Sequence, residues 1–268
     1  MPGLDIKIST LEDFADDLRS QGRHAFSLEE AKKHFDLSDK ALFQALYRLK
    51  QKQRIVQIRK GYYVIISPEY VRQGMIPPAL FIDDMMIALE RPYYVGLLSA
   101  AALHGASHQQ PMEYFVVIKR PPLRAIQSNS LKINFYVKRE WDDADITQIK
   151  TDAGYINVST PELTALDLLY YLESTGLNRS YTIIMELVEK FKMSSLTQTA
   201  KRYPQTAAIQ RLGFLLDTLG EEKMAESLYR VLNGQRYYRT PLSPNKGKEG
   251  SSDNRWKIIV NTELEADL

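Results

Sequence analysis

The chain has 268 residues and 44% of them are hydrophobic, which is enough to bury one or two cores. It contains no cysteine, and this excludes a disulfide framework, a cysteine nucleophile and a thiolate zinc site. The 35 basic and 33 acidic side chains leave a net charge of only +2, but the basic surplus falls entirely within residues 1–70. We therefore expect two unequal domains, of which the N-terminal one carries the excess positive charge.

Three helices are predicted near the N-terminus. The first covers residues 10–20, where apolar side chains recur at helical spacing and Thr10 supplies the N-cap. Ser27 begins the second helix as the first residue of a capping box. The third helix begins at Ser38 and is amphipathic, with an apolar stripe on one face and polar, basic residues on the other.

A basic hairpin is predicted after the third helix. Two β-prone runs, residues 54–59 and 62–66, flank the turn Lys60-Gly61. Residues 38–60 carry seven basic side chains and one acidic side chain, a local charge of +6 that attracts polyphosphates. Three helices followed by such a hairpin predict a winged helix-turn-helix domain over residues 1–70.

The remainder, residues 75–268, is predicted to form a larger domain, so that the whole chain is α+β. Its mixed helices and strands are expected to include a mostly antiparallel sheet. Alternating hydrophobicity favours strands over residues 113–119, 131–137 and 154–158. Helical spacing and capping signals predict helices over residues 79–89, 95–104, 161–172, 180–191, 194–203, 206–219 and 221–232.

The last part of the chain is expected to contain a loop and a strand. Residues 241–254 are rich in Pro, Gly, Ser and Lys, which predicts a mobile loop. Residues 256–260 are predicted to form a final strand that returns to the earlier sheet.

The third helix and the hairpin supply the predicted DNA contacts. A helix fits the major groove, where each base pair presents its own pattern of donors, acceptors and methyl groups. Lys40, Gln44 and Arg48 recur every four residues and therefore share one side of the helix, where glutamine suits adenine and arginine suits guanine. The helix start and the hairpin suit phosphates. The predicted DNA-binding residues are Ser38, Lys40, Gln44, Arg48, Arg59, Lys60 and Tyr62.

No enzyme, cofactor or metal site is predicted. The sequence has neither a glycine-rich phosphate loop nor a serine nucleophile elbow, and the adjacent acids at 83–84 and 142–143 point apart. His104 and His108 have the spacing of metal ligands on a helix, but Gly105 favours a helix end between them. No apolar run reaches the roughly 18 residues of a membrane span, so we expect a cytoplasmic protein without a membrane partner.

Two C-terminal segments, following the winged-helix pattern of residues 42–63, carry a family resemblance. They are the helix of residues 99–105 and the segment Pro161-Glu162-Leu163-Thr164-Ala165-Leu166-Asp167. By periodicity alone both are buried helix faces, with Glu162 in a first turn and Asp167 as a paired or exposed acid. In this order they resemble the AbiE-type (AbiEi) antitoxin family of type IV toxin–antitoxin systems, although Leu163 stands where the family often has arginine.

The resemblance implies a bifunctional protein. Its N-terminal domain would bind double-stranded operator DNA at inverted repeats and repress its own operon, as a monomer or a dimer that pairs on DNA. Its C-terminal domain would counter a nucleotidyltransferase-like toxin in phage defence, without a stable complex.

Two alternatives remain open. In the first, the protein is a ligand-responsive regulator unrelated to a toxin, with a pocket lined by Tyr93, Tyr94, Tyr155, Tyr170 and Tyr171.

The second alternative concerns basic residues interleaved with the predicted strands. They form either a second nucleic-acid surface or a solvated sheet face. They include Lys119, Arg120, Arg124, Lys132, Lys138 and Arg139.

Overall fold

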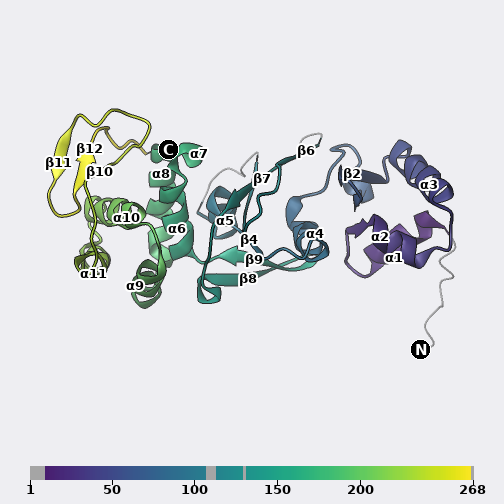
Figure 1. Cartoon of the computed structure of the whole chain (residues 1–268), viewed down its shortest axis with the longest axis horizontal. Coiled ribbons are helices and arrows are strands. Elements are labelled where there is room, and N and C mark those ends of the chain that lie inside the picture. The colour runs from purple at the N-terminus through teal and green to yellow at the C-terminus, as the bar shows by residue number, and fades with distance from the viewer. Residues whose placement is uncertain (1–9, 107–112, 129–130, 267–268) are drawn as a thin grey trace.

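The computed structural model describes residues 10–106, 113–128 and 131–266, which form a mixed α/β fold. The molecule is elongated, with N-terminal helices at one end, a six-stranded sheet in the middle and a group of helices at the other end (Figure 1). This arrangement confirms the predicted α+β class.

The N-terminal end contains α1 (Leu11–Ser20), α2 (Leu28–His34) and α3 (Asp39–Gln51). Their N-caps are the predicted ones, since the hydroxyls of Thr10, Ser27 and Ser38 each accept a hydrogen bond from a backbone N–H three residues later. An antiparallel sheet of order β1-β3-β2 completes this end. Its strands are β1 (Ala25–Ser27), β2 (Ile55–Arg59) and β3 (Tyr62–Ile65). The helices and hairpin are confirmed, while β1 was not predicted.

Both faces of this small sheet are buried along its central strand, β3. Because side chains alternate along a strand, Tyr63 and Ile65 pack with the helices α1 and α3, whereas Tyr62 and Val64 lie on the opposite face. That opposite face shares a hydrophobic core with Phe81 and with other residues of the following segment and the central sheet. The small sheet therefore lies between two hydrophobic cores. The second of these cores continues past residues 70–75, where the boundary between the two predicted domains falls.

The connecting segment leads into the central sheet through two short 3-10 turns and one helix. These are η1 (Pro68–Tyr70), η2 (Pro78–Leu80) and α4 (Ile82–Ala88). The central sheet has the order β6-β7-β5-β4-β9-β8, with three antiparallel and two parallel pairings. Its strands are β4 (Tyr93–Val95), β5 (Tyr114–Ile118), β6 (Ile126–Ser128), β7 (Leu131–Val137), β8 (Ile146–Thr151) and β9 (Gly154–Ser159). The sheet is mostly antiparallel, as predicted, but β4, β6 and β8 were not predicted.

Helix α5 (Leu97–Leu103) packs on the sheet and on α6 (Pro161–Tyr170). Every residue of α6 from Glu162 to Leu169 is buried, which explains why its apolar residues do not form a one-sided stripe. The other helical elements are η3 (Asp143–Asp145), α7 (Leu172–Thr175), α8 (Leu177–Leu187), η4 (Val188–Lys190), α9 (Met193–Arg202), α10 (Thr206–Thr218) and α11 (Glu222–Asn233). Of these, α7, α8, α9 and α10 contact α6, while α11 packs on α9 and α10.

The final strand does not return to the central sheet, so that prediction was wrong. Strand β12 (Ile258–Val260) instead pairs with β10 (Thr240–Pro241) and β11 (Ser251–Asp253) in a separate small sheet. Trp256, fully buried just before β12, is held by Asp217 of α10, whose carboxylate accepts its indole N–H at 2.6 Å. This anchor keeps the end of the chain on α10, and β11 lies in a segment that we expected to be a mobile loop.

Candidate functional site

The outer face of α3 is fixed by what its other face buries. Leu42, Leu46 and Leu49 are at most 4% exposed and hold the helix against the N-terminal core. The opposite side, with Lys40, Gln44 and Arg48, is exposed to solvent. The structure thus brings these three predicted residues together on one accessible helix face.

Not all of the basic charge around α3 is free. Lys52 pairs with Glu12 at 2.9 Å and Arg54 pairs with Asp16 at 2.6 Å, so these cations serve contacts within the N-terminal end. Lys40, Arg48 and Lys60 form no ion pair within the described residues. These three side chains are therefore available to a polyanion.

The hairpin places its predicted residues unequally. Lys60 is exposed at the turn, and Gly61 beside it has the positive φ of 73° that the turn requires. Arg59 is half-buried, and its Nη1 atom has no hydrogen-bond partner within the described part of the chain. Tyr62 is only 4% exposed, because it belongs to the sheet face that packs towards α4, and burial raises its pKa above the ordinary value. Of the predicted residues, Tyr62 therefore lies in the core and away from the accessible face.

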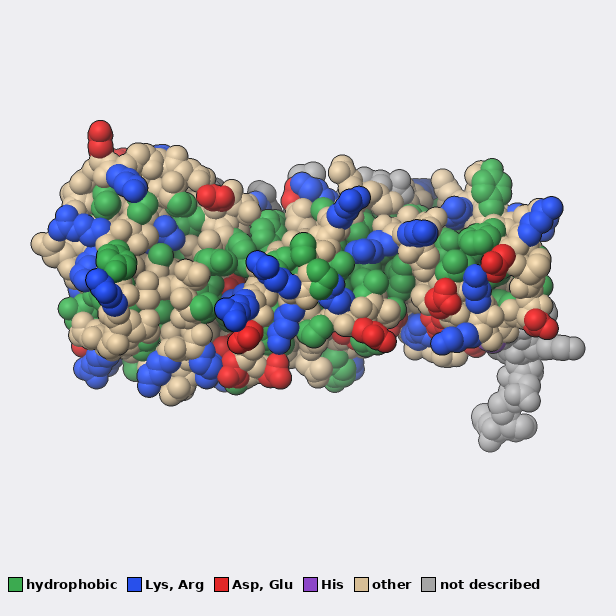
Figure 2. Space-filling model, in the orientation of Figure 1, with side chains coloured by type: hydrophobic (Ala, Val, Ile, Leu, Met, Phe, Trp, Pro, Cys, Tyr) green, Lys and Arg blue, Asp and Glu red, His purple; other side chains and the backbone are tan. Residues whose placement is uncertain are grey.

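Two aromatic residues of α3 were missed by the sequence analysis. Phe43 and Tyr47 are 48% and 59% exposed, beside the polar residues of the same helix. Figure 2 shows hydrophobic and basic side chains next to one another at the end of the molecule where Figure 1 labels α3. The sequence does contain a pattern that could have identified Phe43 and Tyr47. They are an apolar pair four residues apart that does not belong to the buried stripe of the helix.

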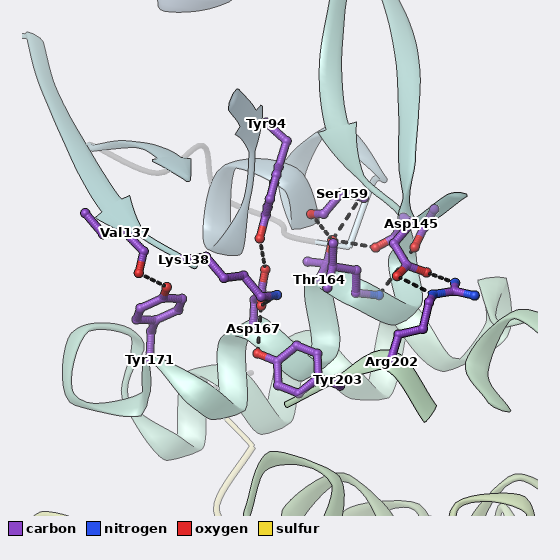
Figure 3. A network of polar contacts seen from close by, with 12 residues as sticks. Tyr94, Val137, Lys138, Asp145, Ser159, Thr164, Asp167, Tyr171, Arg202 and Tyr203 are labelled. Carbon is purple, nitrogen blue, oxygen red and sulfur yellow. Dashed lines mark hydrogen bonds and ion pairs between the residues drawn. The ribbon is translucent and has the colours of Figure 1, made fainter. Parts of the chain in front are cut away.

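A buried carboxylate, Asp167 of α6, joins the central sheet to the helical end (Figure 3). It is 0% exposed and accepts three hydrogen bonds: from the Tyr94 hydroxyl at 2.6 Å, the Lys138 ammonium at 2.7 Å and the Tyr203 hydroxyl at 2.7 Å. Burial, followed by the negative charge of Asp167, raises the pKa of Tyr94 and Tyr203, which keeps both hydroxyls as donors. Asp167 is thus the paired alternative of the two predicted for it.

The other polar residues of the segment that follows β9 also make structural contacts. The carboxylate of Glu162 accepts the Lys192 backbone N–H at 2.8 Å, at the start of α9. The hydroxyl of Thr164 lies 2.7 Å from that of Ser159 and donates to the Thr160 carbonyl. These contacts hold α6 against the sheet and against α9.

A cleft of about 580 Å³ opens beside this cluster, between the end of β7 and the end of α9. Its lining includes Trp141, Tyr170 and Arg202. Of the five tyrosines predicted to share a ligand pocket, only Tyr170 lines this cleft, while Tyr94 is fully buried and Tyr155 is 56% exposed. The structure therefore does not assemble the predicted tyrosine pocket there.

Three of the six basic residues considered as a second nucleic-acid surface have partners within the chain. Lys138 is 6% exposed and paired with Asp167, and Lys132 lies 2.7 Å from Glu113. The ammonium of Lys119 lies over the Trp141 ring, 5.0 Å from its centroid. Lys138 therefore lies in the core and belongs to neither alternative, whereas Arg120, Arg124 and Arg139 are exposed and form no ion pair within the described residues.

The acids and histidines singled out in the sequence have ordinary partners. The Tyr93 hydroxyl donates to Asp83 at 2.8 Å, and the His104 Nε2 lies 2.7 Å from the Ser159 carbonyl oxygen. His108 lies outside the described residues. Among residues 10–106, 113–128 and 131–266, no group of three His, Cys, Asp or Glu side chains has a metal-binding arrangement, and no helix could cross a membrane.

Comparison with known proteins gives one family and one fold. Residues 94–218 match the family model described as the AbiEi antitoxin C-terminal domain. No curated protein sequence matches the chain. The fold is similar to the crystal structure of the RV2827C protein from Mycobacterium tuberculosis, with a TM-score of 0.65 at 16% identity over 92% of this chain and 89% of that one. At this identity the likeness concerns the fold alone, over both ends of the molecule.

Proposed function

Because the chain belongs, through residues 94–218, to the AbiEi antitoxin family, we propose that it is an antitoxin that also represses its own operon. The family match confirms the predicted resemblance and marks the chain as the antitoxin side of a toxin–antitoxin pair. The toxin's identity, the operator and the DNA-binding role belong to the proposal.

The DNA-binding part of the proposal rests on the outer face of α3. We assign residues 1–70 as a winged helix-turn-helix unit in which α3 enters the major groove and the β2–β3 hairpin is the wing. The observation that carries this is the exposed row of Lys40, Gln44 and Arg48, whose two cations have no ion-pair partner in the described chain. Ser38 and Lys60 would bind phosphates, with Arg59 donating from the wing.

The antitoxin part of the proposal concerns residues 75–268. These residues would oppose a nucleotidyltransferase-like toxin encoded beside the antitoxin, without forming a stable complex with it. The matched family region, residues 94–218, extends from β4 to the end of α10 and so includes the central sheet. The proposal therefore assigns the antitoxin activity to this sheet and to the helices that Asp167 joins to it.

A gel-shift titration of the full chain on its own upstream DNA tests the repressor. The expected result for two copies on an inverted repeat is sequence-dependent binding in two steps, which remains tighter than binding to scrambled DNA at both salt concentrations. Equal binding to scrambled DNA that disappears with salt would contradict it.

Co-expression tests the antitoxin. The neighbouring gene is expected to arrest growth when it is expressed alone, and this chain is expected to restore growth. A variant with Lys40, Gln44 and Arg48 all changed to alanine should still restore growth, because the proposal assigns those residues to DNA. Failure of the unaltered chain to restore growth would contradict the antitoxin role.

A further inference from the structure

The exposed aromatic residues on α3 have no explanation in the packing of this chain. Among the described residues, nine large hydrophobic side chains are exposed, and three of them lie within residues 37–47. They are Leu37 at 50%, Phe43 at 48% and Tyr47 at 59% exposure. Leu42, Leu46 and Leu49 already occupy the buried side of α3, so Phe43 and Tyr47 are additional to the core.

Helix geometry places these aromatic side chains directly beside the proposed DNA contacts. Phe43 and Tyr47 are four residues apart and so adjacent on the helix surface. Phe43 follows Lys40 by three residues and Tyr47 follows Gln44 by three, which makes each aromatic residue a neighbour of a polar one. The outer face of α3 thus consists of an aromatic strip and a polar strip side by side.

The positive charge beside the aromatic strip favours DNA over a second copy of the chain as its binding partner. In a symmetric dimer through this face, the same patch of each copy would meet, so the polar strip with the exposed cations Lys40 and Arg48 would face a second strip of the same positive charge. DNA phosphates instead neutralise these cations, while the groove floor offers an apolar group of its own, the C5-methyl of thymine.

We propose that Phe43 and Tyr47 contact thymine methyl groups in the major groove and so determine part of the operator sequence. This inference rests on the proposed DNA-binding function and adds residues to it. Gln44 and Arg48 would recognise base edges by hydrogen bonds, and the aromatic strip would select thymine at neighbouring positions.

The experiment starts from the duplex that the full chain selects from a random-sequence pool. Each thymine of that duplex is replaced in turn by deoxyuridine, which removes only the methyl group, and affinity is measured by fluorescence anisotropy. At one or more positions the loss of the methyl should weaken wild-type binding about fourfold, the value of one buried carbon. Phe43→Ala or Tyr47→Ala should bind the thymine and deoxyuridine duplexes equally at that position.

Two matched variants separate this effect from a general loss of binding. Arg48→Ala should weaken binding but keep the full sensitivity to deoxyuridine. Tyr238→Ala removes an aromatic side chain that is 67% exposed and lies outside α3, so its binding should equal that of wild type.

Three results would overturn the inference. The first is that wild type tolerates deoxyuridine at every position, and the second is that both aromatic variants keep the wild-type sensitivity. The third is that Phe43→Ala converts a DNA-free dimer into a monomer, which would assign the strip to a second copy. If no duplex is selected, the DNA-binding proposal itself fails and the inference fails with it.

Discussion

The Nζ atom of Lys138 and the Oδ1 atom of Asp167 lie 2.7 Å apart in the core, where the two side chains are 6% and 0% exposed. Removing two charges from water is costly, and their attraction compensates for it only when further hydrogen bonds satisfy them. Here the hydroxyls of Tyr94 and Tyr203 supply those bonds. The pair therefore connects the end of β7 to α6. Removing either partner would leave a buried charge without a counter-ion and so lower the free energy of unfolding.

Lys138→Met is expected to lower the free energy of unfolding by about 3–5 kcal/mol, because it leaves the carboxylate of Asp167 buried without a cation. The matched control is Lys132→Met, which breaks an ion pair of the same 2.7 Å length between side chains that are 44% and 38% exposed. That variant should lose less than about 1 kcal/mol. Urea unfolding of both variants measures the difference, and equal losses would show that burial does not govern the Lys138 pair.

Gly213→Ala is expected to destabilise the chain by about 1–3 kcal/mol or more. A Cβ at this position of α10 would overlap the Trp256 ring, and Trp256 is fully buried. Gly234→Ala is the control, because Gly234 has a φ of −88° and no atom within 4 Å of an added Cβ. It should be neutral or slightly stabilising. Thermal unfolding compares the two, and an unchanged midpoint for Gly213→Ala would contradict the tight packing of Trp256.

The stability of the chain is expected to fall as the pH decreases below about 6.5. Burial lowers the pKa of His104 from its ordinary value of 6.5, against the opposing effect of its hydrogen bond to the Ser159 carbonyl. The unfolded chain then takes up a proton at a higher pH than the folded chain, so this stabilisation is complete above the unfolded pKa and decreases below it.

His104→Gln tests that expectation, since glutamine keeps a donor and does not titrate. The urea midpoint should differ less between about pH 7.5 and about pH 5 in the variant than in wild type. An identical difference in both proteins would exclude His104 as a contributor. His24, whose pKa burial also lowers, should account for part of the dependence that remains.

Arg48→Ala and Lys60→Ala are expected to affect operator binding in different ways. Arg48→Ala should cost about 1–3 kcal/mol of affinity and relax the base preference at one position, as for a base contact. Lys60→Ala should weaken binding to all sequences and reduce the salt slope by about 1. Lys201→Ala, at an exposed position of α9, is the control. Negligible effects of both test variants would reject the assigned face.

Much of the fold could be predicted because its elements carry local signals. The caps at Thr10, Ser27 and Ser38 and the apolar stripe of α3 each lie within one helix. Strand β4 was missed since it is three residues long and adjoins the apolar start of α5, and periodicity does not separate a short buried strand from a buried helix.

The sequence contains a pattern that indicates the burial of Tyr62, although the prediction of Tyr62 as a DNA contact did not take it into account. A wing strand with one solvated face alternates between apolar and polar residues, whereas residues 62–66 are continuously apolar. Such a run is typical of a strand buried on both faces. All four residues of β3 are in fact buried.

The partners of Asp167 could not be predicted. Lys138 and Tyr94 are separated from it by 29 and 73 residues, and no local pattern links such distant positions. The sequence alone therefore left Asp167 as either a paired or an exposed acid.

The two-sided burial of the β1-β3-β2 sheet determines where the chain can be cut and recombined. A fragment ending at residue 70 would lose Phe81 and the whole of α4, leaving the face of Tyr62 and Val64 open to water. Such a fragment is expected to aggregate. A graft that moves the proposed DNA-binding face of α3 onto a relative would therefore need to extend through α4. The segment that must be transferred to keep this face folded is longer than the segment proposed to contact DNA.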